Sequence, residues 1–329
     1  MKNKVIVLCA CIGVLVFSFW ASNVESDLGK ERYHEHLVKE TKYSGYDYSK
    51  IDETTFQSKT IDPSSFSSHL PIISFDTKGK EILGGDDKSV DEYIQSTMKV
   101  YDNEGYNSLD GESTYKTESL IRYRGNSSRS FDKKGLRIKL INDKGEDREY
   151  PLLGLSEDTD FILHGPWLDK TLMRNYLGYN LTGEFMEYSP NVRFCEVFVN
   201  GEYRGVYLLV EKIKVDKDKI DISKLNKNSN ITSYLLVITK RYVEDDDLFY
   251  LDNFSRYTNR IVPFSEYNIV YPGKAKMTPS LNTYINEDLS YFERILYSFD
   301  YADENFGYAN YIDIDSFVNY VVFNWLFGI

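Results

Sequence analysis

The residues best suited to chemistry lie around a glycine turn between two predicted strands. Arg124 ends the first strand, Gly125, Asn126 and Ser127 form the turn, and the pair Lys133-Lys134 precedes the second strand. A glycine and small polar residues let backbone N–H groups approach a phosphate, while Arg offers a bidentate guanidinium and Lys a mobile ammonium. The pattern favours a phosphate-bearing ligand. On the residues alone, a plain hairpin with solvated charges explains it equally well.

The phase of the second strand distinguishes its two lysines. Lys134 is in phase with Leu136 and Leu140, so we expect it on the apolar side of the strand, with Lys133 pointing the other way. A cation on an apolar face needs a partner or a ligand. Glu211, which continues the alternation of a later strand, either pairs with Lys134 across the sheet or ends its strand at the surface.

A second polar cluster consists of Asp169, Arg174 and Asn175. It lies at the start of a helix predicted for 168–186, where Asp169 stands in an N-cap position. Capping and an exposed helix face account for most clusters of this kind. From the residues alone, a functional role is therefore the minority interpretation.

Hydrophobic periodicity predicts the elements that position these residues. An Asn200-Gly201 pair between two alternating runs indicates a β-hairpin over 193–210, because both central residues need positive φ. The other expected strands are 119–124, 135–140, 161–163, 233–238 and 268–271, and the other helices are 281–299 and 314–327. This order, a β half with an embedded helix and a helical C-terminal part, predicts an α+β fold.

Composition excludes several functions for this chain of 329 residues. A formal net charge of −12 argues against a nucleic-acid partner. Only four histidines and three cysteines are present, and Cys9 and Cys11 lie in an apolar N-terminal run. A cysteine-based zinc site and an internal disulfide framework are therefore both excluded.

The N-terminus has the pattern of an export signal. Lys2 and Lys4 precede an apolar stretch from Val5 to Trp20, which is slightly short of the roughly 20 residues needed to span a bilayer. We expect residues 1–22 to be a signal peptide or a membrane anchor acting through 5–22, residues 23–70 a polar linker, and residues 71–329 the folded domain. The folded part is then extracytoplasmic, either secreted or anchored and facing outward.

Three spaced motifs carry a family resemblance. They are Arg124-Gly-Asn-Ser-Ser128 with Lys133-Lys134, then Asp169-Lys-Thr-x-x-Arg174-Asn175, and then Phe198-x-Asn-Gly-x-Tyr-x-Gly-x-Tyr-x-Leu-x-Glu211. In this order they resemble the spore coat protein H (CotH) kinase family over roughly 71–329. The resemblance implies a diverged, two-lobed protein-kinase-like fold with a β-rich N-lobe, the embedded helix and a partial helical C-lobe.

The resemblance also implies an activity and its site. It implies transfer of the ATP γ-phosphate, with Mg²⁺ or Mn²⁺, to Ser or Thr of secreted or cell-envelope proteins. The cofactor-binding residues it implies are Arg124, Asn126, Ser127, Lys133, Lys134, Glu211 and Tyr234, the last in a strand beside the adenine. Asp169, Arg174 and Asn175 form a further family motif.

Family members place their catalytic and metal-holding Asp segments after a helix that resembles 317–327. The printed chain ends at Ile329, so we expect no catalytic or metal residue within it and no activity from this stretch alone. Two alternatives remain open on the sequence. One is a non-catalytic surface relative that binds nucleotide or protein, and the other is an envelope adhesin that binds glycans through exposed tyrosines.

Overall fold

The computed structural model describes residues 62–85, 87, 90–125, 127–226, 228–240, 249–250, 265–296 and 298–327. The predicted export signal, most of the predicted linker, and Asn126 lie outside these residues. Within the described residues, no helix is both long and apolar enough to cross a membrane.

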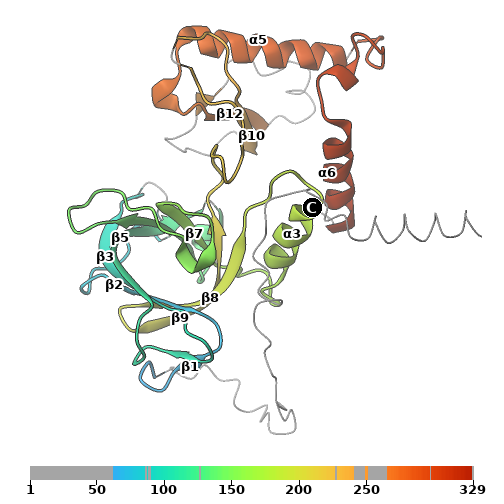
Figure 1. The fold of residues 1–329 in the computed structure, drawn as a ribbon. Coiled ribbons are helices and arrows are strands. Elements are labelled where there is room, and N and C mark those ends of the chain that lie inside the picture. Colours follow the sequence, from blue (N-terminus) through green and yellow to red (C-terminus); the bar gives the residue numbers. More distant parts are fainter. Residues whose placement is uncertain are drawn as a thin grey trace, which may run out of the picture.

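Seven strands between residues 72 and 211 form a closed barrel (Figure 1). They are β2 (Ile72–Asp76), β3 (Ile94–Tyr101), β5 (Tyr115–Arg124), β6 (Gly135–Ile141), β7 (Asp160–His164), β8 (Val192–Val199) and β9 (Glu202–Glu211). Their order around the barrel is β2-β3-β5-β6-β7-β9-β8, and every pair is antiparallel except β2 with β8, which closes the ring. Short strands β1 (Ser67–Ser68) and β4 (Asn107–Ser108) pair beside it.

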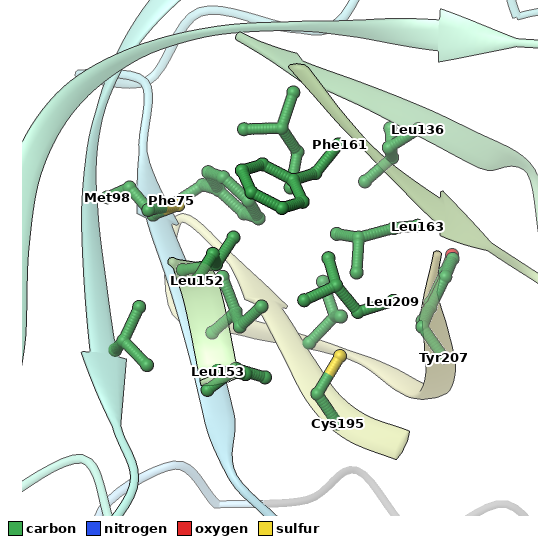
Figure 2. Packing of buried hydrophobic residues seen from close by; sticks show 14 of the residues in the cluster. Phe75, Met98, Leu136, Leu152, Leu153, Phe161, Leu163, Cys195, Tyr207 and Leu209 are labelled. Atoms are coloured by element: carbon green, nitrogen blue, oxygen red, sulfur yellow. The ribbon is translucent and has the colours of Figure 1, made fainter. Parts of the chain in front are cut away.

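Alternation of side chains makes the barrel interior apolar. On β6, Leu136, Ile138 and Leu140 are all buried in the main core cluster, while the residues between them are only half-buried. Figure 2 shows Phe75, Phe161 and other core side chains converging from several strands. A strand with one buried face cannot slip by one residue without exposing that face, so this pattern also sets the register.

The predicted hairpin is confirmed. Asn200 and Gly201 have φ of 52° and 78°, and they join β8 to β9 in the longest antiparallel pair of the barrel. Asn200 also ties the hairpin to β2, because its side-chain oxygen accepts hydrogen bonds from the backbone N–H (2.8 Å) and the hydroxyl (3.0 Å) of Thr77.

Helix α3 (Arg174–Gly183) packs on the outer wall of the barrel, where Tyr176 stacks on Phe194 of β8 with 4.8 Å between ring centroids. The helix is shorter at both ends than the predicted 168–186. It begins later because residues 169–173 form a turn, in which Leu172 has a φ of 61°.

The second half of the chain builds a smaller sheet and two helices, drawn in orange and red in Figure 1. The sheet has the order β10 (Leu235–Lys240), β12 (Ser265–Tyr271), β11 (Phe249–Tyr250), and Ile269 of β12 packs against Ile285 of α5 (Pro279–Leu296). Helix α6 (Ile314–Phe327) lies beside α3. The ring centroids of Phe185, just after α3, and Phe323 of α6 are 6.1 Å apart. Short 3₁₀ helices occur at Ser127–Ser130, Leu152–Gly154, Lys274–Lys276 and Tyr308–Asn310.

The α+β class is therefore confirmed. Its β-rich half is a closed seven-stranded barrel, and the kinase-like arrangement in two lobes remains a prediction.

Candidate anion-binding site

The glycine turn after β5 has the tight geometry that the sequence indicates. Gly125 has a φ of 118°, and a Cβ there would lie 2.1 Å from the hydroxyl oxygen of Ser128. Only glycine fits such a position. The turn continues into the 3₁₀ helix that begins at Ser127, so β5 and β6 are joined by a compact loop.

Lys133 is seated at the end of the barrel. Its Nζ donates to the backbone carbonyl of Val206 and lies 4.9 Å from the ring centroid of Tyr207. Burial lowers the pKa of Lys133, against the opposing influence of Glu196 and Cys195. The prediction that Lys133 points away from the apolar side is wrong, because the loop before β6 folds back against β9 and presses this lysine onto a core tyrosine.

Lys134 lies on the other side of the same loop. Its Nζ donates to the carbonyl of Phe131 (3.0 Å), and its side chain packs against Gly85, where a Cβ would be 3.0 Å from the lysine Cε. The hydroxyl of Tyr207 donates to the Lys134 carbonyl (3.1 Å) and thereby holds the loop down on β9.

Glu211 does not pair with Lys134. It is 1 % exposed, and its two carboxylate oxygens accept backbone N–H groups of Ser156 (2.7 Å) and Asn191 (2.9 Å). Glu211 lies opposite Phe161 on β7, whereas the lysine pair approaches the other end of that strand. Glu211, which the sequence offered as a partner for Lys134, instead joins the loops that contain Ser156 and Asn191.

Asp169 organises the turn that leads into α3. One carboxylate oxygen accepts the backbone N–H (3.0 Å) and the hydroxyl (2.7 Å) of Thr171, and the other accepts the N–H of Arg174 (2.8 Å). Burial acts to raise the pKa of Asp169, but these hydrogen bonds and the nearby Arg174 guanidinium outweigh it and lower the pKa. Arg174 itself is 81 % exposed, so it contributes little to this turn.

The turn brings Asn175 to a histidine for which the sequence predicts no functional role. His164 ends β7, one residue past the predicted strand, and shares a side-chain hydrogen bond with Asn175. Burial lowers the pKa of His164, and the positive charges of Arg124 and Lys133 lower it further, against the effect of the Asn175 bond. A polar residue at a strand end before Gly165-Pro166 was the only sequence signal for it.

Three of the predicted residues influence the pKa of His164. Arg124 from the end of β5, Lys133 from the loop and Asn175 from α3 all act on its ring. Arg124 also acts on Tyr179, one turn further along α3. Arg124 pairs with Gly135 at the start of β6 and Lys133 lies just before that strand, so both cations are at the same end of the barrel. Their charges suit an oxyanion such as phosphate.

Arg129 belongs to the same basic segment, but its guanidinium binds backbone carbonyl groups. It is 4 % exposed, and its guanidinium donates to the backbone carbonyls of Gly84, Asp87 (3.1 Å) and Val90 (2.7 Å). This arginine therefore holds the segment before β3 against the loop, and we assign it a structural role.

Tyr234 lies with the smaller sheet. Its hydroxyl donates to Asp288 of α5 (2.5 Å), and it packs in the cluster of Ile269 and Ile285. Burial, together with the Asp288 carboxylate, raises the pKa of Tyr234 well above its ordinary range. Its place beside an adenine remains a prediction. Ser127 is exposed in the glycine loop.

Metal ligation is a separate matter from phosphate binding. Among the residues that the structure describes, no three His, Cys, Asp or Glu side chains gather as a metal site would require.

Fold and site together define an α+β protein in which Arg124 of β5 and Lys133 of the following loop lie at the same end of a β-barrel. A family model described as CotH kinase protein matches residues 121–329. The chain belongs to the CotH kinase family. No curated protein gives a significant match to it.

The family match begins inside β5, although the barrel begins earlier. Strands β2 and β3 precede the matched region, yet β2 pairs with β8 and β3 pairs with β5. The barrel is therefore closed by residues that precede the matched segment, and removing β2 and β3 would open it between β8 and β5.

Proposed function

We propose that this protein is an atypical protein kinase that binds ATP at the barrel end that carries Arg124 and Lys133 and transfers the γ-phosphate to Ser or Thr of secreted or cell-envelope proteins. Membership of the CotH kinase family supports kinase chemistry at the level of the family. The export pattern of residues 1–22 supports substrates outside the cytoplasm.

The observation that carries the proposal is the placement of two cations at one end of the barrel. Arg124 pairs with Gly135 at the start of β6, and Lys133 of the preceding loop contacts the Gly165 position that follows β7. Phosphoryl transfer demands little covalent chemistry from the protein, and most of the catalysis is positioning and charge stabilisation. Arg124 can hold two phosphate oxygens at once, and Lys133 supplies a second positive charge.

Mg²⁺ or Mn²⁺ would neutralise charge on the β- and γ-phosphates when bound. The described residues assemble no ligand group for it, so every role assigned here belongs to the side chains of the phosphate cluster.

The proposal is tested by ATP binding and by phosphate transfer, measured separately. In titration calorimetry, we expect Lys133→Met to weaken ATP binding about 10- to 100-fold, which corresponds to the roughly 1.5–3 kcal/mol of a hydrogen bond to a charged group. Lys139→Met is the matched control, because Lys139 lies on β6 and pairs with Asp147 at 2.7 Å. Equal ATP affinity in both variants would refute the site.

Transfer is then followed by mass spectrometry of secreted proteins incubated with ATP and the full-length protein. Phosphorylated Ser or Thr that disappears with Lys133→Met supports the kinase. ATP binding without any transfer would instead identify the chain as a nucleotide-binding relative.

A further inference from the structure

Strand β9 contains a β-bulge near its start, next to the loop that precedes β6. Val197 of β8 pairs with Gly205, whereas the adjoining Phe198 pairs with Tyr203, so β9 holds one extra residue at this point. Gly205 has a φ of 96°, in the left-handed region that residues with a side chain rarely adopt. The bulge therefore depends on a glycine, and it leaves an open space where a side chain would otherwise stand.

The ammonium of Lys133 occupies that space. A Cβ at Gly205 would lie 3.1 Å from the Lys133 Nζ and 3.6 Å from its Cε. The next two residues of β9 complete the surroundings, because the carbonyl of Val206 accepts a hydrogen bond from Nζ and the ring centroid of Tyr207 lies 4.9 Å from it. We call these three residues of β9 the lysine seat.

The lysine seat holds a cation without an acidic partner. Within the described part of the chain, Lys133 forms no ion pair with a carboxylate. Glu196 influences its charge, but the two Glu196 oxygens accept hydrogen bonds from the hydroxyls of Ser68 (2.9 Å) and Tyr203 (2.6 Å). An ammonium has three N–H donors, and the Val206 carbonyl takes one of them. The seat thus leaves Lys133 able to donate to an anionic ligand.

We propose that Gly205 is a positioning residue of the ATP site, because its bulge makes the space in which the Lys133 ammonium docks and presents its other N–H groups to a phosphate. This inference rests on the proposed function and adds a residue that touches no phosphate itself. A lysine ammonium stands on a flexible four-carbon stem, and docking it in advance reduces the conformational entropy that ATP binding would otherwise cost.

Gly205→Ala tests the seat, because the added methyl group needs the place of the ammonium. We expect this variant to bind ATP about 5- to 10-fold more weakly in titration calorimetry. Gly201→Ala is the matched control. Gly201 lies in the same hairpin with a φ of 78°, yet no atom lies within 4 Å of its Cβ position. The control introduces similar backbone strain without the clash, and its ATP affinity should stay within about twofold of native.

A double-mutant cycle separates positioning from general disruption of the barrel. Lys133→Ala empties the seat, so adding Gly205→Ala to it should leave the ATP affinity unchanged, although each substitution alone weakens binding. An equal loss of affinity with and without the lysine side chain would show that the alanine acts on the barrel and not through Lys133. That result would overturn the inference.

The outcomes separate this inference from the function beneath it. Native ATP affinity in a folded Gly205→Ala variant overturns the inference and leaves the ATP site intact, whereas no ATP binding by the native protein overturns both. Should Gly205→Ala fail to fold, Tyr207→Leu and Tyr207→Phe replace it, because leucine removes the ring beside the ammonium and phenylalanine keeps it. The inference then requires weaker ATP binding by the leucine variant than by the phenylalanine variant, and equal affinities would contradict it.

Discussion

Gly165 and Lys133 are in such close contact that a Cβ on the glycine would lie 2.9 Å from the lysine carbonyl oxygen. Real Cβ atoms essentially never come that close to another heavy atom, so a larger residue would have to displace the loop. The loop carries Lys133 against Tyr207, whose ring would itself lie 3.1 Å from the added atom. The end of β7 therefore determines where the lysine of the proposed phosphate site stands.

Gly165→Ala tests this contact. We expect the added methyl group to shift the loop before β6 and to weaken ATP binding at least tenfold, because the Lys133 ammonium would move relative to Arg124. Gly273→Ala is the control, since no atom lies within 4 Å of the Cβ position there. Unchanged ATP affinity in Gly165→Ala, measured by calorimetry, would show that the loop position does not govern binding.

Glu211→Gln distinguishes a structural carboxylate from a cofactor ligand. Both Glu211 oxygens accept backbone N–H groups, and an amide would direct N–H toward one of those donors. We expect a loss of about 1–3 kcal/mol in the free energy of unfolding, measured in urea. ATP affinity of the folded variant should not change. Glu202→Gln, at the exposed start of β9, should leave stability within about 0.5 kcal/mol of native.

Asp158 and Lys219 form a buried ion pair in which each side chain is 1 % exposed. Lys214 adds a second contact at 2.8 Å, so this pair ties the segment after β9 to the start of β7. Asp158→Asn leaves the Lys219 ammonium buried without its counter-charge, and we expect a loss of about 3–5 kcal/mol on urea unfolding. Asp218→Asn, at an exposed pair, is the control and should be nearly neutral.

The same pair predicts a pH dependence. Burial raises the pKa of Asp158, but its bonds with Lys214 and Lys219 outweigh burial, and the pKa is lowered overall. The folded pKa is thus below the unfolded value of about 3.9. This contribution to stability is present above that value and is lost as pH falls through the folded pKa. The native protein should therefore lose more stability than Asp158→Asn between pH 5 and pH 2, and parallel curves would contradict this.

Asp169→Ala tests the turn before α3. We expect a loss of about 1 kcal/mol in stability, as for removal of a helix cap, because the N–H groups of Thr171 and Arg174 lose their acceptor. Since the turn positions Asn175, ATP affinity should fall as well. Arg174→Ala, which removes an exposed side chain, should change neither thermal unfolding nor ATP affinity. A larger effect at Arg174 than at Asp169 would show that Arg174, and not Asp169, stabilises the turn.

Local patterns in the sequence were sufficient for several elements. The Asn200-Gly201 turn and the alternation on β5 and β6 follow from backbone preferences and side-chain periodicity, which act over a few residues. The α+β class follows from the order of those elements. Asp169 could likewise be recognised as a capping residue, although the helix begins at Arg174 because the turn takes up the residues between.

Closure of the barrel and the composition of the site were decided by tertiary structure. The pairing of β2 with β8 joins segments more than 100 residues apart, and no local pattern encodes it. The same packing turned Lys133 inward, used Glu211 as an internal clamp and brought Asn175 to His164. Residue types can indicate which groups suit a phosphate, but long-range packing decides which of them face one another, because each contact depends on strands and loops that meet only in the folded chain.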